Sequence, residues 1–155
     1  MVIFCKVVLV FLLLSVFSSS LARPFDTDSF KYHSYKAYSA VGFYTGANCI
    51  AVEVDHIVSF RDAHDSGASD WSDFKKALFA NDRKNHVPSC SKIDELKADL
   101  PPTEFMLKAR ETLGPEFKII EVCEYLNRYH AVKTKYSLSF QNNSKQTFAA
   151  CGLAI

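Results

Sequence analysis

The amino-acid sequence predicts an α+β fold in a small exported domain that is held together by disulfide bonds. A β-branched, partly alternating run at 49–60 indicates strands. Helices are indicated further along, because apolar residues recur there at three- and four-residue steps. Removal of a predicted leader leaves an even number of cysteines, which is typical of a disulfide-bonded secreted protein.

The first 22 residues have the pattern of a secretory signal peptide. Lys6 precedes an apolar run over 7–16, and small residues at Ser20 and Ala22 predict cleavage after Ala22. The run is shorter than the roughly 20 apolar residues that a transmembrane helix needs. We therefore expect a secreted, extracellular protein with a single domain over 23–155 and no membrane partner.

The charge balance of that domain is neutral. Loss of Lys6 with the leader leaves equal numbers of basic and acidic residues. This excludes the strongly basic chain that by itself indicates a nucleic-acid or anionic-membrane binder, although local basic patches stay compatible with the composition.

Four cysteines remain after the leader, and we expect them to form two disulfide bonds: Cys49, Cys90, Cys123 and Cys151. Four cysteines allow three pairings, and the sequence does not choose among them. A tetrahedral zinc site is disfavoured, because such sites need short paired spacings and these cysteines lie 28 to 41 residues apart.

The domain begins with a segment that has no sustained period. Residues 23–48 are rich in aromatic residues, Ser, Asp and Gly, and we expect irregular structure with one short strand. The run at 49–60 then predicts one or two strands, which carry Asp55 and His56.

Short helices and a second strand are expected next. A helix over 62–66 ends at Gly67, and a second helix begins near Ser69. We expect this second helix to bury one apolar face, formed by Trp71, Phe74, Leu78 and Phe79. A polar turn at 81–85 leads to a short strand at 86–89, which Pro88 limits because it lacks an amide proton.

Three further helices are predicted in the second half of the chain. They cover 93–100, 103–112 and 117–136, and prolines or a Gly-Pro pair separate them. The last helix carries one apolar stripe, formed by Ile119, Val122, Cys123, Leu126, Tyr129 and Val132, and is expected to pack on the core. Asn142 begins a match to the N-glycosylation acceptor pattern.

The residues with the clearest chemical potential are an Asp-His pair in the first strand region and an aspartate further along. Metal-assisted phosphodiester hydrolysis needs a group that accepts a proton from water and a carboxylate that holds a divalent cation. His56 and Asp55 supply these two groups. Asp94, on a predicted helix, is a candidate second oxygen ligand. Alone, the Asp-His pair is also compatible with a structural histidine.

Several motifs in this order strengthen the functional interpretation. They are Tyr-Thr-Gly at 44–46, Glu-Val-Asp-His-Ile-Val at 53–58, Ser-Gly-Ala at 66–68 before Trp71, Phe-Ala-Asn-Asp at 79–82 before Asn85, Leu-Pro-Pro at 100–102, Cys-Glu-Tyr at 123–125 and Ala-Val-Lys-Thr-Lys-Tyr at 131–136. The sequence resembles the secreted branch of the HNH, or His-Me finger, endonucleases over about residues 44–140.

The resemblance implies a ββα-metal nuclease-like domain with additional helices. It implies that His56 is the general base, that Asn85 braces the loop and orients His56, and that Asp55 and Asp94 hold a divalent metal ion, Mg²⁺ or Mn²⁺. The implied activity is hydrolysis of DNA or RNA with low sequence specificity. Lys97, Arg83 and Lys84 are expected to bind the substrate.

The sequence departs from the family at three positions. Asp94 stands where the family usually has Asn or His, Ala98 where it has Gly, and Ser59 where it often has Pro. An aspartate is a good ligand for a hard cation, but its charge also repels a phosphate. The alternative function is therefore a catalytically degenerate nuclease fold that acts as a secreted binding or effector protein. A toxin-like or inhibitor-like disulfide scaffold is less favoured, because the helices predict a real core.

The remaining basic residues and histidines each allow a functional and a purely structural interpretation. A phosphate-binding surface, or only solvated helix faces, can be formed by Lys75, Lys76, Arg128, Lys133 and Lys135 together with Arg83 and Lys84. His86 either shapes the site or is a turn histidine without a catalytic role. His64 either approaches a phosphate or faces solvent, and we expect it to face solvent.

Overall fold

A computed structural model describes residues 23–155, so the signal peptide predicted at 1–22 lies outside the described residues. Two strands, β1 (Val52–His56) and β2 (His86–Cys90), form an antiparallel pair. The register sets Val52 opposite Cys90 at one end and His56 opposite His86 at the other. The strand predicted at 86–89 is thus confirmed.

The chain between the strands forms α1 (Phe60–Asp65) and α2 (Asp73–Ala80), joined by the 3₁₀ turn η2 (Ala68–Asp70). Serine hydroxyls cap both α-helices, because Ser59 accepts from the amide of Asp62 and Ser72 from that of Lys75. A second 3₁₀ turn, η3 (Arg83–Asn85), leads into β2.

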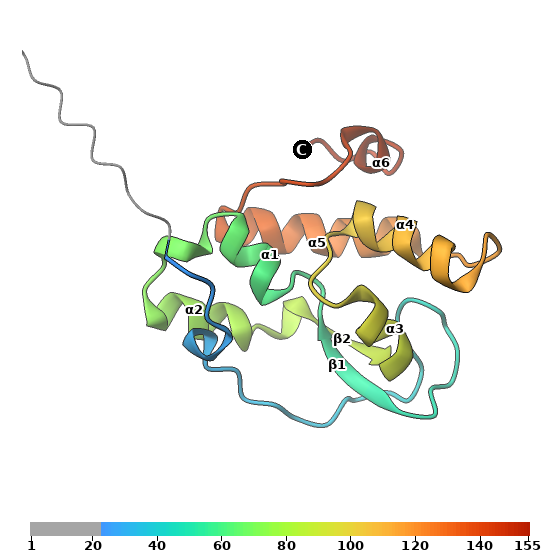
Figure 1. Cartoon of the computed structure of the whole chain (residues 1–155), viewed down its shortest axis with the longest axis horizontal. Coiled ribbons are helices and arrows are strands. Elements are labelled where there is room, and N and C mark those ends of the chain that lie inside the picture. The colour runs from blue at the N-terminus through green and yellow to red at the C-terminus, as the bar shows by residue number, and fades with distance from the viewer. Residues whose placement is uncertain (1–22) are drawn as a thin grey trace, which may run out of the picture.

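The chain continues from β2 directly into α3 (Ser91–Lys97), which lies beside the strand pair (Figure 1). Next come α4 (Pro102–Leu113), α5 (Val122–Tyr136) and the short α6 (Lys145–Ala149). α4 begins at a proline, as is common for the first position of a helix. In Figure 1, α5 and α4 run along one side of the molecule, with α6 outside them.

The segment before β1 is mostly irregular, as predicted, with the 3₁₀ turn η1 (Thr27–Phe30) near its start. The short strand predicted in 23–48 is reduced to an isolated bridge between Val41 and Asn48. From this segment the amide of Phe43 donates to the carbonyl of Pro88, at 2.8 Å. The first segment therefore covers part of the edge of β2.

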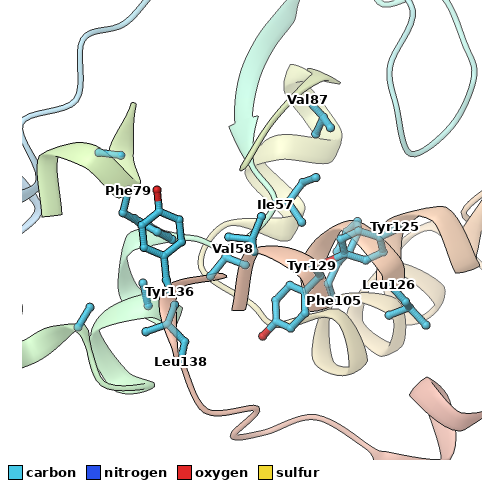
Figure 2. Packing of buried hydrophobic residues seen from close by; sticks show 14 of the residues in the cluster. Ile57, Val58, Phe79, Val87, Phe105, Tyr125, Leu126, Tyr129, Tyr136 and Leu138 are labelled. Atoms are coloured by element: carbon cyan, nitrogen blue, oxygen red, sulfur yellow. The ribbon is translucent and has the colours of Figure 1, made fainter. Parts of the chain in front are cut away.

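The hydrophobic core lies between the chain that leaves β1 and helices α4 and α5. Figure 2 shows Ile57 and Val58 between two aromatic groups. One group contains Phe79 and Tyr136, and the other contains Phe105, Tyr125 and Tyr129. All of these side chains are buried, and Tyr125 meets Phe105 edge to face. The residues that directly follow the Asp-His pair are thus fixed in the core.

Two disulfide bonds are present, which confirms the expectation from the cysteine count. They join Cys49 to Cys90 and Cys123 to Cys151, which settles the pairing that the sequence left open. The first bond ties the loop before β1 to the end of β2. The second ties the beginning of α5 to the chain after α6.

Two helix predictions need correction. The expected buried face of α2 includes Phe74 and Leu78, but these side chains are 74% and 52% exposed, whereas Trp71 and Phe79 are buried. The helix predicted at 117–136 begins at Val122, because 117–121 are irregular chain and turn, in which the amide of Ile120 donates to the carbonyl of Tyr44. In both cases the apolar residues recur at helical spacing, but the rest of the chain buries only some of them.

A buried ion pair joins α1 to α5, and three side chains that were predicted to lie at the surface are buried. Lys133 is fully buried, and its Nζ donates to Asp62 Oδ1 and Ser66 Oγ, at 2.5 Å each. Lys76 and His64 are also buried, at 6% and 7% exposure. Lys76 and Lys133 are therefore unavailable to a phosphate, and His64 does not face solvent.

No helix within 23–155 has the length and apolar character needed to cross a membrane.

Candidate active site

The fold brings together the Asp-His pair of β1 and the first turn of α3. A hollow of about 250 Å³ lies between them, and its wall includes Asp55, His56 and Asp94. Because β2 pairs with β1 and α3 follows β2 without a loop, the strand pair fixes where α3 begins. Three residues that were predicted to act together thus line one hollow.

His56 is held as a neutral base. Its Nε2 lies 2.8 Å from the carbonyl oxygen of Ala80, which only accepts hydrogen bonds, so Nε2 carries the proton and Nδ1 keeps its lone pair. Burial lowers the pKa of His56 from 6.5 to about 4, an effect that the Ala80 hydrogen bond only partly opposes. The side chain is therefore unprotonated at neutral pH and can accept a proton from water.

His86 is a structural partner of His56. Its Nε2 lies 2.9 Å from the same Ala80 oxygen and 3.0 Å from His56 Nε2, and Tyr35 Oη lies 2.9 Å from its Nδ1. In the tautomer that satisfies the Ala80 and Tyr35 contacts, His86 donates to Ala80 and accepts from Tyr35, so the two Nε2 atoms both carry a proton and do not hydrogen-bond to each other. The reading of His86 as a residue that shapes the site is thereby favoured over that of an uninvolved turn histidine.

Asn85 braces the chain that leaves β1. Its Oδ1 accepts from the amide of Val58 at 2.8 Å, and its Nδ2 donates to the carbonyl of Val58 at 3.0 Å. Asn85 is fully buried, and its carbonyl also accepts from the amide of Ile57. The side chain therefore acts on His56 through the backbone of 57–58 rather than by contact with the imidazole.

Asp55 is bound from two sides. Tyr44 Oη donates to its Oδ2 at 2.5 Å, and Lys97 Nζ donates to its Oδ1 at 3.0 Å. The Tyr44 contact was missed by sequence reasoning, which used this residue only as part of the Tyr-Thr-Gly motif. The signal was present, because a tyrosine that is buried needs a partner for its hydroxyl.

The expected substrate contact of Lys97 does not fit its position. The side chain is fully buried, and its ammonium group also donates to the carbonyl of His56 at 2.9 Å. A lysine placed in this way fixes the backbone and the carboxylate of the Asp-His pair. It is therefore a positioning residue, whereas Arg83 and Lys84 are exposed.

Asp94 lies against Asp55. Burial and the negative charge of Asp55 raise the pKa of Asp94 to about 7, although Lys97 opposes this shift. Two neighbouring carboxyl groups with a single lysine leave a net negative charge when both are ionised. This donor set fits a divalent cation that prefers oxygen ligands.

The metal interpretation relies on two protein ligands. No group of three or more His, Cys, Asp or Glu side chains in residues 23–155 is placed to hold a metal ion. A cation bound by Asp55 and Asp94 would complete its coordination with water and substrate oxygens, as Mg²⁺ commonly does.

Ala98, at the wall of the same hollow, has an unusual backbone conformation. It caps α3 with φ 45° and ψ −124°, a region that glycine adopts readily and other residues rarely. The turn that ends α3 thus has the shape that a glycine would favour.

Comparison of the whole chain with protein-family models, with curated proteins and with solved structures finds no significant match.

Proposed function

We propose that the protein is a secreted, metal-dependent endonuclease of the ββα-metal, or His-Me finger, type, which hydrolyses phosphodiester bonds of DNA or RNA. The observation that carries the proposal is the neutral His56, tied through Nε2 to Ala80 and placed in one hollow with Asp55 and Asp94. The order β1, β2, α3 around this hollow supports the same fold type. The leader and the disulfide bonds support export.

In this mechanism the Nδ1 atom of His56 accepts a proton from the attacking water. Asp55 and Asp94 are the residues that would hold the divalent cation. When bound, such a cation supplies Lewis-acid stabilisation of the charge that develops on the phosphate and the leaving 3′ oxygen.

The remaining residues keep the reacting groups in place. Asn85 and Lys97 hold the backbone at 56–58, and Tyr44 and Lys97 orient the carboxylate of Asp55. The carbonyl of Ala80, which accepts from Nε2, fixes the tautomer of the His56 ring. Preorganisation of this kind removes the cost of aligning base and ligands during the reaction.

The test uses the purified, oxidised protein with supercoiled plasmid and with RNA, in Mg²⁺, in Mn²⁺ and in EDTA. We expect cleavage that needs metal and that His56→Ala lowers by about 10²- to 10⁴-fold, the usual share of a general base. His33→Ala, at an exposed histidine, is the matched control and should cleave normally. Full activity of a folded His56→Ala protein would overturn the mechanism.

A degenerate nuclease fold that binds another molecule is the second candidate function. One observation favours it, because Tyr44 and Lys97 already satisfy both oxygens of Asp55. The two candidates differ in metal binding. A rise in melting temperature with Mn²⁺ that Asp94→Ala abolishes supports the enzyme, whereas no metal response together with no cleavage supports the binding protein.

A further inference from the structure

A second cavity lies behind the candidate active site and is lined mainly by basic side chains. Its volume is about 540 Å³, and four of its lining residues are cationic: Arg83, Lys84, Arg128 and Lys135. Only one lining residue is acidic, Glu124. In a domain without net charge, such a local excess of positive charge is a specific feature of this surface.

The cavity and the candidate active site are joined by the histidine pair. His86 lines the basic cavity, His56 lines the hollow with Asp55 and Asp94, and the two ring centroids are 4.4 Å apart. The two hollows are thus lined by neighbouring residues.

The basic side chains are partly held in place. Arg128 Nε pairs with Glu124 at 2.7 Å and Lys135 Nζ with Asp82 at 2.6 Å, and all four groups keep some solvent exposure. Arg83 stacks on the ring of Tyr35 with its guanidinium carbon 3.4 Å from the ring centroid. In residues 23–155, neither Arg83 nor Lys84 has a carboxylate within salt-bridge distance. Their charges are free to meet an anion.

An aromatic side chain completes the cavity. Tyr38 lines it and is 71% exposed, so its ring is accessible to a partner. Basic groups that follow a backbone, together with an exposed aromatic ring on which a base can stack, are the combination by which proteins bind single strands. In a duplex the bases are already stacked and paired, so this ring would find no free base.

We propose that the basic cavity binds the backbone and one unpaired base of a single-stranded nucleic acid, next to the phosphate in the candidate active site. The cations meet the phosphates and Tyr38 stacks on the base. This inference rests on the proposed nuclease function and narrows its substrate to single strands.

The experiment measures binding without cleavage. Fluorescence anisotropy of labelled 12-nucleotide single strands, DNA and RNA, and of the matching DNA duplex is recorded with the oxidised protein in EDTA at several salt concentrations. The variant Lys84→Gln/Arg128→Gln should bind single strands about tenfold more weakly and with a shallower salt dependence. Tyr38→Ala should weaken single-strand binding about tenfold and leave duplex binding unchanged.

The matched control is Lys92→Gln/Lys108→Gln, which removes the same charge from a different surface hollow and should bind normally. If the cavity variant and this control bind single strands with equal affinity, the cavity is not the binding site and the proposal is overturned. Tighter binding to duplex than to single strands would overturn the assignment to single strands. Binding of single strands through the cavity, without cleavage when metal is added, would support the binding site and overturn the proposed nuclease function. Failure of the binding site can thus be distinguished from failure of the nuclease proposal.

Discussion

Two residues of the candidate active site are placed at a cost in folding free energy. Ala98 has the backbone of a glycine, and Asp94 has its carboxyl against a second carboxylate. Both positions line the hollow that also contains His56. Strain and unfavourable charge at a site of this kind persist only where the surrounding fold enforces them, which supports a functional role for the hollow.

Ala98→Gly should stabilise the protein. Relief of a strained backbone is worth about 1 to 3 kcal/mol, and the extra freedom of glycine in the unfolded chain subtracts up to about 1 kcal/mol. We expect a net gain of about 1 kcal/mol in the free energy of unfolding, measured by urea denaturation. Ala131→Gly, in the interior of α5, is the control and should lose about 1 kcal/mol. A loss at Ala98 similar to that at Ala131 would contradict the assigned strain.

Asp94 should make stability fall as the pH rises from about 4 to 7. Its pKa is raised from 3.8 to about 7 in the folded protein, so the folded state binds more protons than the unfolded state in this window. The lowered pKa of His56 acts in the opposite direction between about 4 and 6.5, but it is common to wild type and variant. Asp94→Asn should therefore gain stability over wild type progressively from pH 4 to 7.

The measurement is the melting temperature against pH in EDTA, for wild type and Asp94→Asn. Glu95→Gln, at an exposed neighbour on α3, controls for the loss of a carboxylate from the helix. A constant difference between wild type and Asp94→Asn at all pH values would show that Asp94 does not titrate as described.

At the scale of elements, α1 and α5 are joined by a polar contact inside the core. Asp62 of α1 accepts hydrogen bonds from Lys133 and Tyr129 of α5, and its own exposure is 7%. A buried pair of this kind adds little over apolar packing, but removal of one partner leaves an unpaired charge in the core. The contact therefore fixes how the two helices meet, and its loss is costly.

Lys133→Met should destabilise the protein by about 3 kcal/mol, because Asp62 then keeps its buried charge without a counter-ion. Arg128→Met, which breaks the exposed pair with Glu124 on the same helix, is the control and should cost less than about 1 kcal/mol. Both values come from chemical denaturation. Equal effects of the two substitutions would contradict a strong role for the buried pair.

Local sequence patterns predicted the helices and strands better than they predicted which side chains are buried. β-branched runs, apolar spacing, prolines and glycines predicted the strands and the core face of α5. They also predicted helices at 62–66, 93–100 and 103–112, which the structure has at 60–65, 91–97 and 102–113. The exposure of Phe74 and Leu78 could not be predicted, since a helical period shows which side chains share a face but not how much chain covers it.

For the candidate site, too, the sequence predicted the residues but not all of their contacts. Asp55, His56, Asn85 and Asp94 were singled out from the sequence, and the structure places Asp55, His56 and Asp94 in one hollow, with Asn85 bracing its chain. The burial of Lys97 and the contact of His86 with His56 depend on strand register and on the approach of α3, neither of which residue types define. Tyr38 and Arg128 share a cavity only through the tertiary fold.

At the scale of the whole molecule, the two disulfide bonds stabilise different parts of the chain. Cys49–Cys90 closes the end of the strand pair away from His56 and fixes the loop that carries Tyr44. Gly42 of this loop packs so closely that a Cβ there would lie 2.9 Å from Cys90 Sγ. Cys123–Cys151 holds the C-terminal segment against α5. The first bond therefore holds the chain on both sides of the Tyr44–Asp55 contact.

Removal of either bond should cost similar stability but have different local effects. Chain-entropy arguments for loops of 41 and 28 residues give about 4 kcal/mol for each bond. In Cys49→Ala/Cys90→Ala we expect amide hydrogen exchange to accelerate over 41–56, because the loop with Tyr44 and the strand that carries Asp55 lose their tie. In Cys123→Ala/Cys151→Ala the acceleration should be confined to 122–125 and 145–155, and the proposed nuclease activity should survive at temperatures where the protein stays folded. Loss of protection over 41–56 in both variants would show that the second bond also supports the site, and that the C-terminal segment belongs to the same cooperative unit as the strand pair.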